Sequence, residues 1–513
     1  MSNRTKNSLR NSYTALAFYF LEMLIGFWSR KVFIDYLGTE VLGLNTTSAN
    51  LLQFLNIAEL GIVSAVTFTL YKPIANRDKK SIDEIISVQG WLYRRIGMFV
   101  LIGAVVMMCF FPLIFAKVEL PMWYVYATFS AYLYSSLLTY FFNYKQIILS
   151  ASQQEYKITM SYKSILIIKN LVQIYAISHF NNPYEWWLIL HFAVSTLASV
   201  NINRIIKKNY PNLDVNISKG KELKNKYQII ITKVKQLFFH KIAGFVLSQT
   251  SSLIIYAFTS LTMVALYGNY IIVTNSIKIM FNTAFNGVNA SIGHLISTSD
   301  TSKSIAVFKE LFTLRFLCTT AILFSLYRLL DPFICVWMGS EYLMDSTIVF
   351  LILAILYIEM MRGVIDSYIA ASGLFKDIYA PIVEAALNLT LSITLGYFFG
   401  ISGILSGVLI SLLCVVFVWK PYFLFKHGMK CSGLFYVKDY IKHIIIFAIS
   451  ATASTYFLNF CFTDTINTFL TFALYAVVTF ITFATIESVL LYIATSSMKN
   501  LAKRFLPMFK IRR

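Results

Sequence analysis

The sequence has few charged residues for its length. Only 13% of its 513 residues are charged, 58% are hydrophobic, and the mean hydropathy is +0.66. A soluble domain carries about 25% charged residues, which keep its surface in contact with water. The composition therefore excludes a soluble protein of this length and indicates an integral membrane protein.

The sequence also lacks the motifs and polar segments that an enzyme would need. It contains no HExxH, GxSxG or Walker sequence, and its longest polar interval, roughly residues 204–235, is too short for a catalytic domain. The six cysteines are scattered without a CxxC pair, so they predict neither a zinc site nor a disulfide framework. We expect no enzyme, no metal and no cofactor. Any coupling energy would come from a gradient of H⁺ or Na⁺, from the membrane potential or from the substrate gradient.

What the sequence has in abundance is apolar segments of helical length. A helix needs about 20 apolar residues to cross about 30 Å of hydrocarbon, and such segments recur along the whole chain. We predict an all-α polytopic membrane protein with about 14 transmembrane helices. The expected spans are residues 12–36, 41–71, 92–115, 121–149, 158–180, 184–203, 240–260, 263–295, 307–330, 346–371, 379–399, 401–425, 443–461 and 467–494.

The basic residues predict the orientation of these spans. The net charge is +20, and the lysines and arginines concentrate in alternate loops, whereas the longest outer loop, residues 331–346, has none. Because cytoplasmic loops carry an excess of Lys and Arg, both termini are predicted to be cytoplasmic. Topology explains the charge, so we expect no nucleic acid partner.

A long basic loop separates two groups of spans. The predicted parts are an N-terminal six-helix half (1–203), a cytoplasmic linker (204–239), a C-terminal six-helix half (240–425), and two additional helices with a basic tail (426–513). Residues 41–81 resemble residues 263–304, and the segment that ends at Asn170 resembles the segment that ends at Asn388. Both offsets are about 220 to 225 residues. The pattern predicts two pseudo-repeats around a central cavity.

Glycine positions predict two local features. A short outer corner is expected around Gly38, followed by one long helix over residues 41–71 that carries Glu59 well inside it. Gly400, Gly403 and Gly407 place small residues along one face of a later span, which predicts close packing of helices.

Several ionisable residues fall within the predicted spans. An ionisable group at membrane depth costs at least about 2.5 to 3.5 kcal/mol, so it normally faces a polar interior. Lys169 and Lys278 each lie midway along a span without a carboxylate at i±3 or i±4. Arg30 and Lys31 are adjacent, so at least one should face a cavity or a headgroup. The candidate substrate-binding residues are Lys169, Lys278, Arg30, Lys31, Glu22 and Glu59.

A structural role for such residues remains open. Either lysine could pair with an acid on another helix. Glu359, Arg362 and Asp366 are spaced i, i+3 and i+7 on one helix face, so we expect a structural cluster in which both acids neutralise Arg362. Arg315 lies near the end of its span, and we expect its long side chain to reach the interface.

Two stretches of the sequence resemble a known family. Residues 30–85 contain LGxxxLGLN, AELGI and LYKPIAxxD, and residues 363–413 contain GLFK, EAxxNL and GIxG. These pieces are similar to those of bacterial oligosaccharide flippases of the Wzx type, in the multidrug/oligosaccharidyl-lipid/polysaccharide exporter (MOP) superfamily. The resemblance covers essentially the whole chain, with about 14 spans in two halves.

The resemblance implies a function. The protein would flip an undecaprenyl-diphosphate-linked oligosaccharide from the cytoplasmic to the outer leaflet of the bacterial inner membrane, by alternating access, for surface polysaccharide and exopolysaccharide synthesis. The cationic cavity would hold the diphosphate while the polyprenyl tail stays among membrane lipids. A glycan polymerase and glycosyltransferases would be further partners. The alternatives are a cation-coupled multidrug exporter of the same superfamily, whose pocket should favour acids, and an enzyme or scaffold of glycan assembly.

Overall fold

The protein is helical throughout the part of the chain that the structure describes. The computed structural model describes residues 3–59, 61–286, 292, 295–296, 301–372, 374, 379–462 and 468–510, and no strand occurs in these residues. They form two compact units, which divide between Ala265 and Leu266. The predicted all-α polytopic membrane fold is confirmed.

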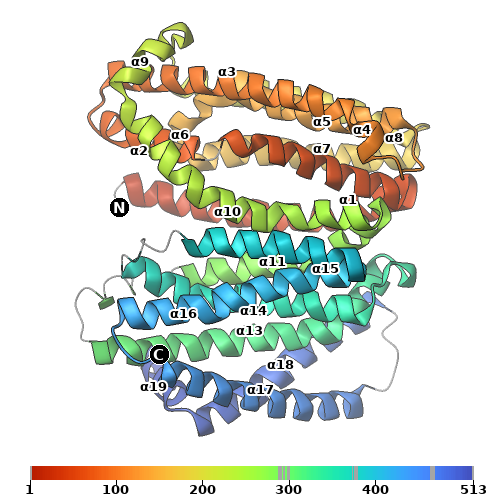
Figure 1. The fold of residues 1–513 in the computed structure, drawn as a ribbon, viewed down its shortest axis with the longest axis vertical. Coiled ribbons are helices and arrows are strands. Elements are labelled where there is room, and N and C mark those ends of the chain that lie inside the picture. Colours follow the sequence, from red (N-terminus) through yellow and green to blue (C-terminus); the bar gives the residue numbers. More distant parts are fainter. Residues whose placement is uncertain are drawn as a thin grey trace. The chain divides into compact units, whose positions relative to one another are not determined.

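The first unit contains helices up to the start of α11 (Figure 1). In chain order they are α1 (Asn3–Leu55), η1 (Asn56–Glu59), α2 (Ile62–Ala75), α3 (Lys79–Cys109), α4 (Phe111–Ile114), α5 (Met122–Phe141), η2 (Asn143–Gln146), α6 (Ile147–Ala151), α7 (Glu155–His179), α8 (Pro183–Asn209), η3 (Ile217–Lys219), α9 (Gly220–Lys226) and α10 (Gln228–Phe258). Helix α11 (Leu261–Asn286) begins in this unit, and its residues from Leu266 onward belong to the second unit. On α3, Val100 is fully buried whereas Phe99 and Ile102 are exposed. Such exposed apolar side chains suit a surface that faces lipid.

The second unit contains the remaining helices. In chain order they are α13 (Thr301–Trp337), η4 (Ser340–Tyr342), α14 (Ser346–Ala371), α15 (Tyr379–Leu412), η5 (Leu413–Trp419), α16 (Lys420–Phe423), η6 (Leu424–Gly428), α17 (Leu434–Cys461), α18 (Phe469–Ala494) and α19 (Ser496–Lys510). Figure 1 shows α13, α14, α17 and α18 running side by side within this unit, and their contacts agree.

Six helices of the described residues are long and apolar enough to cross a membrane, judged by length and composition. A seventh span is added if residues Tyr13–Glu59 and α2, which are bent by 43° at their junction, are counted together. The predicted number of about 14 spans is compatible with this set, and it stays a prediction.

The expected corner at Gly38 is present. Gly38 has φ 83° and ψ 166°, a conformation that interrupts the helical backbone of α1 and that a residue with a Cβ rarely adopts. The corner therefore divides α1 into two helical segments.

The prediction of one long helix over residues 41–71 is wrong. Helix α1 ends at Leu55, a 3₁₀ turn follows over Asn56–Glu59, and α2 begins at Ile62 after Gly61, whose φ is 94°. Hydroxyl groups of neighbouring helices bind the side chains of this turn. Glu59 therefore lies at a break in the helix and not inside it.

Glycine packing in α15 agrees with the prediction. Gly400 has φ 57° and separates two helical segments. A Cβ added at Gly403 would overlap the backbone at Leu395, and one added at Gly407 would overlap the backbone at Ser392. The small residues therefore allow the two segments to lie in contact.

The basic loop and the helix after it belong to the first unit. Helix α10 packs on α1 and α2, and α9 packs on α3. On α9, Lys226 forms an ion pair of 2.5 Å with Glu84 of α3. This division differs from the predicted start of the C-terminal half at residue 240, because α10 has its packing partners in the first unit.

Candidate functional site

A cavity of about 420 Å³ lies within the first unit. Both segments of α1 line it, together with α5, α7 and α8. We call it the cationic cavity, and its lining residues are Ser29, Arg30, Phe33, Leu42, Asn45, Thr46, Ala49, Asn50, Tyr132, Lys169, Asn170, Gln173, Trp187 and His191. This volume falls in the range of small-molecule sites, about 300 to 1,000 Å³.

The corner in α1 explains how distant parts of the sequence meet there. The break at Gly38 lets residues 29–33 and residues 42–50 line the same cavity. The second segment is held close to the start of α11, because a Cβ added at Gly43 would overlap the backbone of Leu261. The glycines of the LGxxxLGLN piece therefore shape the cavity wall.

The lining includes two cations and no acidic residue. Arg30 donates a hydrogen bond of 2.9 Å to the carbonyl oxygen of Ala265. Lys169 is half-buried and forms no hydrogen bond or ion pair with any described residue. A partly desolvated ammonium without a counter-ion is costly, so the cavity is suited to an anion.

Aromatic and amide groups form the rest of the wall. Tyr132 and Trp187 pack against His191, with ring centroids 5.2 and 5.5 Å away. Gln173, one helical turn after Lys169, donates a hydrogen bond of 3.0 Å to the carbonyl oxygen of Trp187. Within the described residues, the Oδ1 atom of Asn45 and the Nδ1 atom of His191 are buried without a hydrogen-bond partner. The cavity thus offers polar atoms that its own walls do not satisfy.

Two further candidates of the first unit do not line the cavity. Lys31 pairs with Asp35 at 3.5 Å, and both side chains are more than 40% exposed. Glu22 pairs with Lys163 at 2.5 Å. Of the adjacent cations at positions 30 and 31, only Arg30 lines the cavity.

Glu59 lies in the break between α1 and α2. Its carboxylate oxygens accept hydrogen bonds from the hydroxyl groups of Tyr93, at 2.6 Å, and Tyr140, at 2.9 Å. Asn56 in the same turn accepts a hydrogen bond of 3.2 Å from Ser136. These bonds satisfy a polar turn inside a helical protein, which indicates that Glu59 fixes the shape of the break.

The predicted cluster of the second unit is larger than its sequence spacing suggests. Lys278 pairs with Glu359 at 2.8 Å, so Glu359 neutralises this lysine in place of Arg362. Arg362 pairs with Asp366 at 2.9 Å and lies 3.6 Å from Glu384.

A third cation completes this network. Lys420 pairs with Asp366 at 2.7 Å. Three cations therefore meet three acids in the second unit, and Lys278 has a counter-ion where Lys169 has none among the described residues.

Arg315 is buried, and the prediction that it reaches the interface is wrong. Its side chain is 4% exposed and donates to the amide oxygen of Asn282 at 2.8 Å and to the carbonyl oxygen of Met360. The guanidinium lies against Gly363, where a Cβ would overlap it. A glycine on the facing helix thus provides the space, and no local pattern around Arg315 indicates this.

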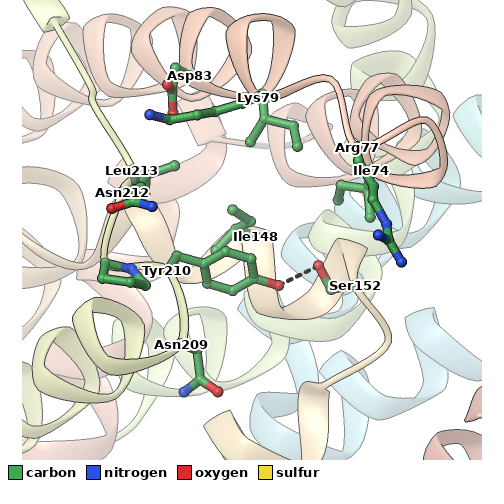
Figure 2. A pocket seen from close by; sticks show the side chains of 12 residues that line it. Ile74, Arg77, Lys79, Asp83, Ile148, Ser152, Asn209, Tyr210, Asn212 and Leu213 are labelled. Carbon is green, nitrogen blue, oxygen red and sulfur yellow. Dashed lines mark hydrogen bonds between the residues drawn. The ribbon is translucent and has the colours of Figure 1, made fainter.

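A second cavity of the first unit, of about 340 Å³, lies where the start of the basic loop passes α2, α3 and α6 (Figure 2). Tyr210 donates a hydrogen bond of 2.7 Å to the hydroxyl oxygen of Ser152 beside it. Its cations Arg77 and Lys79 are exposed, and Lys79 interacts with Asp83. Because these charges are solvated and partly balanced, this cavity is a weaker candidate for anion binding.

The described residues form neither a candidate metal site nor a disulfide bond. These residues contain no group of three or more His, Cys, Asp or Glu side chains that could hold a metal ion. The six cysteines are free thiols.

Comparisons with known proteins support the fold. No family model matches the chain, and no curated protein matches it in sequence. Among solved structures it is similar to lipid II flippase MurJ in an inward closed conformation, with 14% identity, a TM-score of 0.63, and coverage of 92% of this chain and 98% of that chain. It is also similar to an inward-facing multidrug resistance MATE family transporter of the MOP superfamily, with 12% identity, a TM-score of 0.57, and coverage of 78% and 93%. The chain therefore shares the fold of these two solved structures.

Proposed function

We propose that this protein flips a lipid-linked anion across a membrane, with its anionic headgroup bound in the cationic cavity. The observation that carries the proposal is that two cations, Arg30 and Lys169, line a cavity whose lining includes no acid. The proposed cargo is an undecaprenyl-diphosphate-linked oligosaccharide, moved from the cytoplasmic to the outer leaflet. The fold shared with a lipid II flippase supports this choice.

The chemistry of the cavity suits a diphosphate that carries a sugar. A guanidinium offers two parallel donors to a phosphate, and an ammonium adds a point charge. The amide side chains of Asn50 and Asn170 can bind sugar hydroxyl groups. A polyprenyl tail has no place among these polar groups and would remain in lipid.

A cation-coupled multidrug exporter is the second candidate, because the fold is also that of a MATE family transporter. A pocket for an organic cation should present acids. The acids of the first unit lie elsewhere, since Glu22 pairs with Lys163 and Glu59 binds two tyrosine hydroxyl groups. The charge of the cavity therefore favours an anionic cargo.

The membrane and orientation of the protein are part of the proposal. The distribution of basic residues supports an orientation with both termini in the cytoplasm. The resemblance to bacterial flippases supports a location in the bacterial inner membrane. The polymerase and glycosyltransferase partners, the surface polysaccharide and the coupling ion stay predictions.

The experiment that tests the proposal uses purified protein in liposomes that carry a lipid-diphosphate oligosaccharide in one leaflet. An added sugar-modifying enzyme reports the sugar that reaches the other face. We expect exposure that depends on the protein and that is lost in the double variant Arg30→Gln/Lys169→Gln. Absence of exposure with the wild type, together with gradient-driven efflux of an organic cation, would favour the exporter.

A matched control removes two charges of the second unit. The double variant Lys278→Gln/Glu359→Gln deletes an ion pair of 2.8 Å without changing the net charge. It should retain flipping, because this pair lies outside the cationic cavity. Equal loss in both double variants would assign the effect to general destabilisation.

A further inference from the structure

Helices α13, α17 and α18 of the second unit enclose the buried carboxyl group of Glu487, which is not among the predicted site residues. Near the start of α18, Tyr475 accepts a hydrogen bond of 2.9 Å from Arg328 of α13. Two turns later, the ring of Phe483 stacks on that of Phe324, with the ring centroids 4.5 Å apart. One turn later, Glu487 lies 2.7 Å from the hydroxyl oxygen of Thr320. The two helices are therefore antiparallel, and Glu487 points into their interface.

Glu487 has no counter-ion among the residues that the structure describes. Its exposed fraction is 0%, and no lysine, arginine or histidine of the described residues forms an ion pair with it. Its Oε1 atom is buried without a hydrogen-bond partner in the same set of residues. An ionised carboxylate in such a place would lose its hydration without compensation, at a cost of several kcal/mol.

Thr320 lies within hydrogen-bond distance of two acceptors, and its single hydrogen cannot satisfy both. The Oγ1 atom of Thr320 is 2.7 Å from the carbonyl oxygen of Phe316 and 2.7 Å from Oε2 of Glu487. A hydroxyl group has one hydrogen and accepts through its lone pairs. If Thr320 donates to Phe316, then Glu487 must be the donor in the second contact, and both bonds form only when the carboxyl group carries a proton.

The interface also contains buried polar groups. The hydroxyl groups of Thr319, Ser450, Ser454 and Thr479 are buried without hydrogen-bond partners among the described residues. They come from all three helices.

We propose that Glu487 is a proton-binding site, which is occupied while α13, α17 and α18 are packed as observed and releases its proton when this interface separates. The titratable groups that face it are Cys318 on α13 and Tyr357 on α14. On α17, His443 bonds to Thr313 closer to α19. On α19, Arg504 forms an ion pair of 3.2 Å with Glu310.

Coupling of this proton to transport rests on the proposed function, whereas occupancy of the site does not. A carboxyl group that must be protonated for close packing links the packing equilibrium to pH. A flippase that opens this interface during its cycle would therefore release one proton per opening.

The test is infrared difference spectroscopy of the full-length protein in lipid, which detects the carbonyl stretch of a protonated carboxyl group without any substrate. We expect a band at neutral pH that is absent from Glu487→Gln and present in the control Lys278→Gln/Glu359→Gln. Raising the pH of the folded wild type should abolish the band. Thr320→Val, which removes the acceptor but keeps the shape, should shift it.

Three results would overturn the proposal. Identical spectra of wild type and Glu487→Gln would mean that the carboxyl group is ionised. A band that persists until the protein unfolds would mean a fixed hydrogen bond. Loss of the band on adding Na⁺, in wild type alone, would indicate a sodium site. Failure of the wild type to flip lipid would refute the proposed function and leave the band assignment intact.

Discussion

Replacing Lys169 by methionine should weaken anion binding and leave the empty protein as stable as before, or more stable. Methionine keeps the length and the helix propensity of the side chain. Lys169 has no partner among the described residues, so its removal breaks no contact and relieves the cost of a half-buried charge.

The size of the binding effect follows from the lost interaction. A hydrogen bond between an ammonium and a phosphate contributes about 1.5 to 3 kcal/mol. Its loss should raise the Kd of an anionic headgroup roughly 10- to 100-fold. Inorganic pyrophosphate is a suitable soluble probe, because it presents the same diphosphate group.

Lys278→Met should behave in the opposite way. This change leaves Glu359 without its partner at 2.8 Å. Breaking a buried pair costs about 3 to 5 kcal/mol. The side chains of this pair are 25% and 32% exposed, so we discount that cost to about 1 to 2 kcal/mol. Pyrophosphate binding should not change.

The assay compares thermal unfolding of the two variants in detergent, with and without pyrophosphate. Ligand binding raises the unfolding temperature by mass action, so pyrophosphate should stabilise wild type and Lys278→Met but have little effect on Lys169→Met. If Lys169→Met unfolds as early as Lys278→Met, then Lys169 has a structural partner and the reasoning is refuted. Equal stabilisation of both variants by pyrophosphate would remove Lys169 from the anion site.

Three further substitutions test other features. Gly43→Ala should reduce the yield of folded protein in size-exclusion chromatography, because its Cβ would overlap backbone atoms at the start of α11; normal yield and stability would contradict this packing. Gly363→Ala should lower the unfolding temperature by displacing the buried guanidinium of Arg315, an effect that Arg315→Met should largely remove. Hydrogen bonds from Ser81 hold the pKa of Asp78 below its usual value, so the stability advantage of wild type over Asp78→Asn should be full at neutral pH and disappear on acidification; a pH-independent difference would argue against it.

The sequence contains the information for the fold and for the two cations of the cavity. Apolar runs predict the helices, and Gly38 and Gly400 mark two breaks because few other residues adopt a positive φ. Arg30 and Lys169 could be selected because an ionisable residue in a span is costly, and both line one cavity.

The remaining features depend on packing between helices that are distant in sequence. Lys278 and Glu359 are 81 positions apart, and spacing on one helix says nothing about such a pair. Averaged hydropathy does not reveal the break before Gly61, because the hydroxyl groups that bind its polar side chains lie on other helices. Glu487 could have been found as a lone acid in the last apolar span, but its burial and its contact with Thr320 needed the structure.

The unbalanced charge of the cationic cavity has an electrical consequence. Lys169 is a positive charge without a counter-ion among the described residues, and a bound anion cancels it. If the cavity changes the side of the membrane to which it opens, the empty protein moves this charge through the transmembrane field and the loaded protein moves less. A potential of 100 mV acts on each unit charge with about 2.3 kcal/mol. The voltage of an energised cell, negative inside, would therefore draw the empty cavity back toward the cytoplasm and set the direction of the cycle.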